Sequence, residues 1–483
     1  MTDMTANGVP PAAPVYRPGE HPDLPPPILV AGPIAWLKRN FFSSIGNTVL
    51  TFLALLLLYL TIPGFVNWAF IEANFGSGLA VTRVVELKVT ETAAGVFEQP
   101  SEVNSTGALD VKLTNIVIPG NVPGAAIGKV ELVNLPSQRQ STFALSDSRF
   151  ELRGGELKLL PGVKIDPAKE TSVSLGIVVN AASRDDCPKP GACWVMVSNR
   201  LGQFVYGFYP SGERWRINVT FLLFVIAAAA LLIDGVPGKR YWAMFMFIGF
   251  PILAFELLVG GTVLRHVPTD KWGGLMLTLV IAIVGIVFSI PLGILLALAR
   301  RSFMPVNHLL SVLFIEFVRG VPLITILFMA NVMLPLFLPK GVTFDILLRI
   351  LIGVTLFSAA YIAEVVRGGL QAIPKGQFEG AMAMGLGYWQ MMRLVVLPQA
   401  LRISIPGLVN TSIGLFKDTT LVAIVGLYDF LNIIKASTKD QNWLGLSMEG
   451  YVFAAAVYWM FCFGMSRYSM HLERKLHTGH KKR

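Results

Sequence analysis

The sequence predicts an all-α polytopic membrane protein of about eight transmembrane helices with an inserted extracytoplasmic β domain. Of the 483 residues, 53% are hydrophobic and 14% are charged, whereas soluble globular domains carry about 25% charged residues. Residues 275–299 contain no charged side chain, and a helix needs ~20 apolar residues to cross the hydrocarbon. By contrast, residues 70–212 are hydrophilic over most of their length and carry the alternating pattern of strands.

Residues 1–45 are predicted to be a disordered cytoplasmic tail. They include Pro25, Pro26 and Pro27 in a row, and no apolar period runs through most of them. Such a composition buries too little apolar surface to fold. The first apolar run starts near Asn47 and is long enough to span, so residues 46–69 are expected to form a transmembrane helix and not a signal peptide.

Eight apolar stretches are long enough to cross the membrane. They lie near residues 47–68, 217–233, 241–260, 275–299, 309–337, 346–363, 403–425 and 451–467. Residues 213–262 therefore hold two additional helices, and residues 273–470 hold a core of five. Gly320 and Pro322 interrupt the fifth stretch, which predicts a kinked or tilted span.

The net charge of +10 is attributed to the positive-inside rule and not to nucleic-acid binding, because Lys and Arg gather beside the cytoplasmic ends of spans. With both termini cytoplasmic, residues 471–483 form a basic cytoplasmic tail. The other basic residues on that side are Lys38, Arg39, Lys239, Arg240, Arg300, Arg301, Arg367, Lys375, Arg393 and Arg402. The basic residues near span ends on the opposite side are spread over four loops, which weakens this orientation without reversing it.

Residues 70–212 are placed outside the membrane. Alternating residues such as Val85, Leu87 and Val89 predict short antiparallel strands packed as a small sandwich. In the same segment, Cys187 and Cys193 are candidates for a disulfide in an oxidising compartment. No metal site is expected there, because no histidine lies nearby to complete four ligands.

The loop between the sixth and seventh spans, residues 368–400, is unusually rich in Ala, Gly, Met and aromatic residues for a cytoplasmic loop. Its length allows two short helices, with residues 385–387 as the turn. An exposed apolar patch of this kind marks an interaction surface. We therefore expect a partner to cover this loop.

The same loop resembles the motif E-A-A-x3-G-x9-I-x-L-P of permeases from binding-protein-dependent ABC importers. Five residues fall at the spacing of the motif: Glu379, Ala381, Gly385, Leu397 and Pro398. Gly380 replaces the first Ala, and Val395 replaces Ile. The resemblance implies an ABC type I importer permease core over residues 273–470. It also implies that the residues from Glu379 to Gly385 form a coupling helix that docks on an ATPase, so Gly380 joins the five as an ATPase-coupling residue.

Further segments resemble the polar amino-acid branch of that family. They are residues 316–323, 360–369, 397–402 and 416–421. The three N-terminal spans and Ala192-Cys193-Trp194 look like the M-type permease of the general L-amino-acid importer. The resemblance implies a bacterial inner-membrane subunit that translocates polar L-amino acids delivered by a periplasmic binding protein.

The resemblance also implies a second homologous permease subunit, with a heterodimer expected, and an ABC ATPase subunit that binds ATP and Mg. This chain has no G-x4-G-K-[ST] phosphate loop, so ATP hydrolysis is assigned to that partner. We expect no cofactor in the chain itself and no enzymatic activity, because no set of nucleophile and base and no metal cluster stands out.

Charged residues inside the spans are candidates for the translocation path, because charges at mid-membrane cost roughly 2.5–3.5 kcal/mol and turn toward the bundle interior. Glu316 and Arg319 are three residues apart and can share a helix face, where they either line the path or form a structural ion pair. Glu364 and Arg367 are expected to pair with the loop 368–400. Asn410 and Lys417 share a face two turns apart, and Asp418 points elsewhere. A structural role remains open for each.

Two other classes of function remain open at this stage. One is an ATP-independent secondary transporter or channel with a periplasmic sensing domain, although such proteins often show inverted repeats that are not seen here. The other is a sensor or scaffold whose working part is the insertion, residues 80–185.

Overall fold

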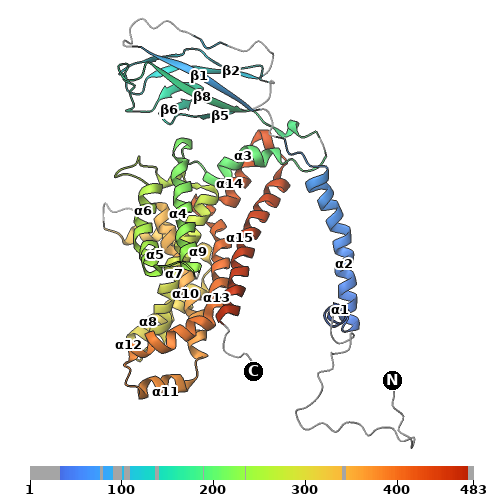
Figure 1. Ribbon diagram of the computed structural model, residues 1–483, viewed down its shortest axis with the longest axis vertical. Helices are drawn as coiled ribbons and strands as arrows, with labels where there is room; N and C mark the ends of the chain where they lie inside the picture. Colours follow the sequence, from blue (N-terminus) through green and yellow to red (C-terminus); the bar gives the residue numbers. More distant parts are fainter. Residues whose placement is uncertain are drawn as a thin grey trace, which may run out of the picture. The chain divides into compact units, whose positions relative to one another are not determined.

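A computed structural model describes residues 33–76, 80–90, 100–102, 109–135, 141–188, 190–233, 235–339 and 344–476. The chain divides into two compact units, Met1–Ala73 and Asn74–Arg483. Figure 1 shows a mainly helical molecule with one β-rich part formed by β1 to β8.

The first unit contains α1 (Pro33–Phe41), α2 (Ile45–Val66) and the π-helical turn η1 (Asn67–Ile71). Ser44 caps α2, since its hydroxyl accepts a hydrogen bond of 3.2 Å from the Asn47 backbone N–H. The helix α1 corrects the prediction that the whole of residues 1–45 lacks regular structure. Its apolar residues Trp36, Leu37 and Phe41 recur at the three-to-four-residue spacing of a helix. Residues 1–32 of the predicted tail lie outside the described residues.

The second unit begins with a β-sandwich. Its strands are β1 (Ala80–Thr90), β2 (Asp110–Leu113), β3 (Val117–Pro119), β4 (Ala126–Val133), β5 (Thr142–Leu145), β6 (Phe150–Arg153), β7 (Glu156–Leu159) and β8 (Ser172–Asn180). One sheet has the order β3-β1-β8-β5 and the other β2-β4-β7-β6. Most neighbouring strands are antiparallel, whereas β1 and β3 are parallel. The core of the sandwich comes from the alternating positions, with Leu87, Val111 and Leu175 fully buried.

The helices that follow the sandwich form a bundle. They are η2 (Arg184–Asp186), α3 (Val195–Tyr206), η3 (Ser211–Glu213), α4 (Arg214–Leu232), α5 (Lys239–Met244), η4 (Phe245–Gly249), α6 (Phe250–Leu258), η5 (Thr269–Lys271), α7 (Gly274–Arg300), α8 (Pro305–Gly320), α9 (Leu323–Phe328), η6 (Met329–Met333), η7 (Leu334–Phe337), α10 (Ile346–Gln371), α11 (Lys375–Ala383), α12 (Tyr388–Met391), η8 (Met392–Val396), α13 (Leu397–Asp418), η9 (Thr419–Val425), α14 (Phe430–Ser437), η10 (Gln441–Trp443) and α15 (Ser447–Leu476), with the short strand β9 (Tyr428–Asp429) before α14.

In the part of the chain that the structure describes, seven helices are long and apolar enough to span a membrane. A pair of helices, Pro305–Gly320 and Leu323–Phe337, is bent by 109° and makes an eighth span when the two are counted as one. The break falls at Gly320 and Pro322, where the kink was predicted, because proline disrupts the helical hydrogen-bond ladder. The helix α15 reaches Leu476, so residues 471–476 of the predicted basic cytoplasmic tail continue the last helix. Residues 477–483 lie outside the described part.

The centre of the bundle is α7, α10 and α13, which pack side by side (Figure 1). Small residues permit this packing. A Cβ atom at Gly293 of α7 would lie 2.5 Å from the Ile362 side chain of α10. One at Gly369 of α10 would lie 2.5 Å from the backbone oxygen of Ala400 in α13. Close backbone approach through small residues is the usual way in which membrane helices associate.

Candidate functional site

The predicted interaction loop is a hairpin of α11 and α12 at one end of the bundle (Figure 1). Its turn closes with a Schellman motif. The Gly385 N–H donates to the Met382 carbonyl at 2.9 Å, and the Leu386 N–H donates to the Ala381 carbonyl at 3.2 Å. Gly385 has a φ of +75°, which an L side chain adopts only with strain. The glycine of the motif thus ends α11 and sets the direction of the chain into α12.

The hairpin is anchored to the bundle on its inner side. Ala381 is 6% exposed and belongs to a buried cluster with residues of α7, α8, α10 and α13. The Arg301 guanidinium lies 5.6 Å from the centre of the Phe378 ring, and the same side chain donates to the Leu370 carbonyl at 3.1 Å. Gln399 of α13 donates to the Gln377 side chain at 3.0 Å. These contacts link the hairpin to α10, to α13 and to Arg301 at the end of α7.

The outer side of the hairpin carries large apolar side chains in solvent. Met384 is 81% exposed, Trp389 71% and Met382 57%. The Glu379 carboxylate is exposed and makes no ion pair or hydrogen bond with the residues that the structure describes. Met382 and Met384 lie in residues 372–387, outside the candidate spans, so lipid does not account for these two side chains, whereas Trp389 lies at the start of the candidate span Tyr388–Val425. We name this surface, Glu379, Met382, Met384 and Trp389, the hairpin face.

The remaining predicted coupling residues occupy distinct places. Gly380 is exposed, and a Cβ atom there would meet nothing within 4 Å. Leu397 and Pro398 begin α13, with Pro398 in its first turn, where proline costs no hydrogen bond. Ala381 and Gly385 are thus brought together in one motif, whereas Leu397 and Pro398 begin the helix that leads from the hairpin back into the bundle.

A network of ion pairs lies beside the hairpin and ties three helices together. Arg300 of α7 pairs with Glu316 of α8 at 2.8 Å and with Glu364 of α10 at 2.5 Å. Glu364 also pairs with Arg319 at 3.6 Å and with Arg367 at 2.8 Å. Glu316 and Arg319 therefore hold partners on other helices. The expected pairing of Glu364 and Arg367 with the loop 368–400 is wrong, because Arg300 and Arg319 reach Glu364 from neighbouring helices.

Three polar residues of α13 were predicted to lie on the translocation path: Asn410, Lys417 and Asp418. Asn410 and Lys417 are both exposed, and their side chains make no hydrogen bond or ion pair with the described residues. Asp418 is partly buried and lies toward the end of the same helix. An amide and an ammonium group on the outside of a membrane helix are costly against lipid. This face of α13 therefore needs an aqueous path or a partner chain.

A buried carboxyl group at Asp429 was missed in the sequence. It is 0% exposed and accepts hydrogen bonds from the Leu431 N–H at 3.0 Å, from the Tyr458 hydroxyl at 3.4 Å and from the Asn432 side chain. Burial raises its pKa to about 6, although these hydrogen bonds act in the opposite direction. The usable sequence signal was an Asp directly before the apolar start of a helix, the N-cap pattern.

Cys187 and Cys193 form a disulfide next to α3. The Cys193 N–H donates to the Glu449 carboxylate at 3.2 Å, which connects this segment to the start of α15. Among the residues with described positions, no three His, Cys, Asp or Glu side chains are grouped so that they could hold a metal ion.

The candidate spans and the central trio of closely packed helices together define a multi-pass membrane protein. The comparisons with known proteins agree. Residues 289–478 match the family described as binding-protein-dependent transport system inner membrane component. The chain is 56% identical over 300 residues to the inner membrane amino-acid ABC transporter permease protein YhdY of Escherichia coli, covering 62% of this chain and 82% of that protein.

A second relative is the glutamate/glutamine/aspartate/asparagine transport system permease protein BztC of Rhodobacter capsulatus. It is 45% identical over 351 residues, covering 60% of this chain and 80% of that protein. The chain belongs to the family of binding-protein-dependent transport system inner membrane components, and it is a multi-pass inner-membrane permease of ABC importers. This membership favours the importer over the ATP-independent transporter and the scaffold.

Proposed function

We propose that the chain translocates polar L-amino acids across the bacterial inner membrane, driven by a separate ATPase that binds ATP and Mg. The relatives named above are amino-acid permeases, which supports this class of solute. The solute would arrive from a periplasmic binding protein, and a second homologous permease, different in sequence, would complete the path. Both termini are placed in the cytoplasm by the distribution of basic residues.

The hairpin face is the observation that carries the proposal. The exposed side chains of Met382 and Met384 lie outside the candidate spans, and exposed apolar groups of this kind mark an interaction surface. The motif at Glu379 to Gly385 is the one by which the sequence resembles coupling helices. ATPase residues that cover Met384 and Trp389 would bury their apolar area, while Glu379 would find a basic partner.

The anchoring of the hairpin explains how docking would become movement. Close-packed interiors shift as rigid bodies between discrete arrangements and do not deform continuously. Ala381 and the Arg301–Phe378 contact join the hairpin to α7, α10 and α13. When the ATPase closes, the hairpin would turn these three helices as one body, and the path would open to the other side of the membrane.

The open face of α13 is the part of the path that this chain would supply. Lys417 offers a cation to a carboxylate, and Asn410 offers both a donor and an acceptor. These groups suit the zwitterionic part of an amino acid. Glu316 and Arg319 are assigned to the structural network with Glu364, where they would hold α8 against α10 during the movement.

The test is Glu379→Lys in the full transporter, with Glu473→Lys as the matched control. Both glutamates are exposed, and Glu473 lies on α15, away from the hairpin. We expect Glu379→Lys to abolish ATPase copurification and uptake while the thermal stability of the permease stays unchanged, and the control to behave as the wild type. Full uptake by the Glu379→Lys protein would refute the coupling role.

A further inference from the structure

The N-terminal helix α1 has one apolar side and one basic side. At ~100° per residue, Trp36, Leu37 and Phe41 fall within an arc of about 140°. Lys38 and Arg39 fall in the opposite arc. The three apolar side chains are exposed, and the rings of Trp36 and Phe41 lie 5.6 Å apart. A helix with this pattern is typical of a segment that lies between an apolar and an aqueous phase.

The two sides of α1 are chemically consistent. Asn40 lies on the apolar side, and its side-chain amide donates to the Trp36 carbonyl of the same helix at 2.8 Å. On the other side, the charges of Lys38 and Arg39 meet no acidic residue along the chain, because none occurs from Pro33 to Ile71. The basic side therefore suits a surface that carries negative charge, such as a layer of lipid phosphates.

The helix α2 places the boundary of the hydrocarbon at its second turn. Its first two turns carry the polar residues Asn47, Thr48 and Thr51, and no charged residue follows until Glu72. At 1.5 Å per residue, the stretch Phe52–Ile71 is about 30 Å long. The hydrocarbon layer of a bilayer has the same thickness, ~30 Å. The apolar part of this candidate span therefore begins just after Thr51.

The end of α1 is held at this boundary. Only the residues from Phe42 to Ser44 separate α1 from α2, and Figure 1 shows α1 beside the first turns of α2. The Thr51 hydroxyl donates to the Phe41 carbonyl at 2.8 Å. The rings of Phe42 and Phe52 lie 6.0 Å apart. Since Thr51 marks the edge of the hydrocarbon, the last turn of α1 lies at the membrane surface.

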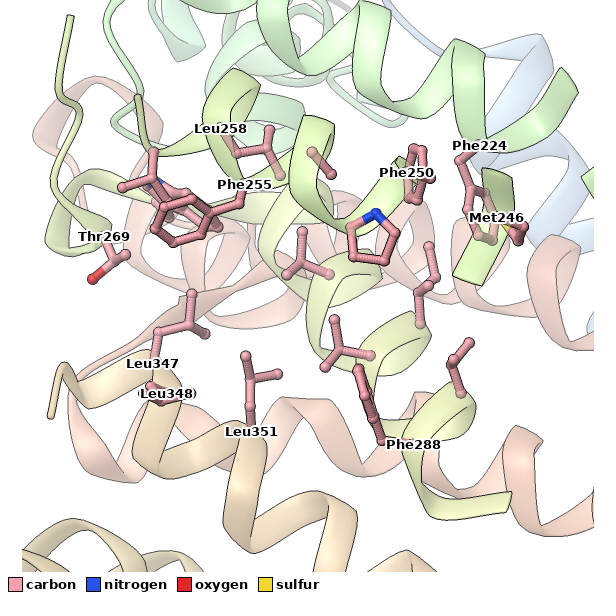
Figure 2. A pocket seen from close by; sticks show the side chains of 18 of the residues that line it. Phe224, Met246, Phe250, Phe255, Leu258, Thr269, Phe288, Leu347, Leu348 and Leu351 are labelled. Atoms are coloured by element: carbon pink, nitrogen blue, oxygen red, sulfur yellow. The ribbon is translucent and has the colours of Figure 1, made fainter. Parts of the chain in front are cut away.

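Apolar surface by itself does not identify what covers it. Within the spans, the groove between α4, α6, α7 and α10 is an example (Figure 2). Phe224, Phe255 and Phe288 line it, and such a lining does not distinguish a lipid chain from a protein side chain. The helix α1 differs in two respects: its apolar side is opposed by a basic side, and its end is fixed at the edge of the hydrocarbon. Together these observations select the lipid surface.

We propose that α1 lies in the headgroup layer of the cytoplasmic leaflet, with Trp36, Leu37 and Phe41 toward the acyl chains and its basic side toward the lipid phosphates. The choice of leaflet rests on the proposed placement of the N-terminus in the cytoplasm. Interfacial helices bury their apolar side by ~5–10 Å, and tryptophan is enriched at this level of the membrane. Bound in this way, α1 sets the depth of the first span, and this role is independent of the coupling hairpin.

The experiment uses the full chain with Cys462→Ser, in inside-out vesicles of phosphatidylethanolamine and phosphatidylglycerol. Because Cys187 and Cys193 are joined in a disulfide, a single introduced cysteine then carries a fluorescent probe. The probe is attached at Leu37→Cys and, as the matched control on the same helix, at Arg39→Cys. We expect bromine atoms on the lipid acyl chains to quench the probe at position 37, and iodide in the water to quench the probe at position 39. Each agent should have little effect on the other probe.

Equal quenching of the two probes by either agent would overturn the proposal, because α1 would then lie wholly in water or wholly in lipid. Loss of the bromine quenching at position 37 once the ATPase and a second permease have assembled would overturn it as well, because protein would then cover the apolar side. Iodide that reaches position 39 only from the periplasmic side would contradict the leaflet, and with it the proposed topology. Failure of the coupling test at Glu379 would change none of these results, so the two proposals fail separately.

Discussion

Gly380 within α11 and Gly385 just after its end lie five residues apart and should respond in opposite directions to the same change. Gly385 has a φ of +75° and ends the helix through its Schellman bonds. An alanine there costs about 1–2 kcal/mol, because its Cβ atom crowds the following carbonyl oxygen. Gly380 lies within the helix with open space around it, and an alanine there should stabilise α11 by ~1 kcal/mol. The two variants should therefore differ by about 2–3 kcal/mol in the local opening of the hairpin.

Amide hydrogen exchange of the purified permease measures this opening directly. Since about 1.4 kcal/mol corresponds to a factor of ten, amides of α11 and the turn should exchange roughly 5- to 30-fold faster in Gly385→Ala and about fivefold slower in Gly380→Ala. Amides of α7 should not change in either variant. Unchanged exchange in Gly385→Ala would show that the turn does not depend on the left-handed glycine, and the physical account of the motif would fail.

Two further predictions concern the charged groups. Glu364→Gln should lower the free energy of unfolding by about 1–2 kcal/mol, because three arginines lose a shared carboxylate that is 15% exposed; thermal unfolding would measure the loss, and Glu473→Gln should show none. Asp429 has a folded-state pKa raised from 3.8 to about 6, so its stabilising contribution is complete below about pH 4 and is lost as the pH rises through about 6. Asp429→Asn should therefore raise the melting temperature near neutral pH and flatten its change between pH 4 and 6; a variant whose pH profile matches the wild type would contradict this assignment.

The elements that the sequence could predict are those set by local composition. Uncharged apolar runs identify the spans because a helix in lipid must satisfy its own backbone, and the break at Pro322 follows from the missing N–H of proline. Alternation of apolar and polar residues at Val85 and Leu87 identifies the sandwich, because one face of each strand is buried. The turn at Gly385 was also foreseeable, because a helix commonly ends on a glycine in the left-handed conformation.

What escaped prediction depends on neighbours that are distant in the sequence. Glu364 pairs with Arg367 of its own helix, but its partners Arg300 and Arg319 come from α7 and α8, and no spacing along α10 reveals these two. Asp429 lies in a connection between spans that looks hydrophilic, yet the fold buries it against Tyr458. In each case, the packing of separate helices determines the chemistry of the group.

The accessibility of Met384 tests the central claim most directly. A Met384→Cys permease in a Cys462→Ser background would be treated with a membrane-impermeant maleimide in inside-out vesicles, with and without the ATPase subunit. We predict rapid labelling of the permease alone, because Met384 is 81% exposed, and protection once an active complex has assembled. Equal labelling in a complex that hydrolyses ATP, or labelling only from the periplasmic side, would contradict the assignment of the hairpin face as the surface that receives the ATPase.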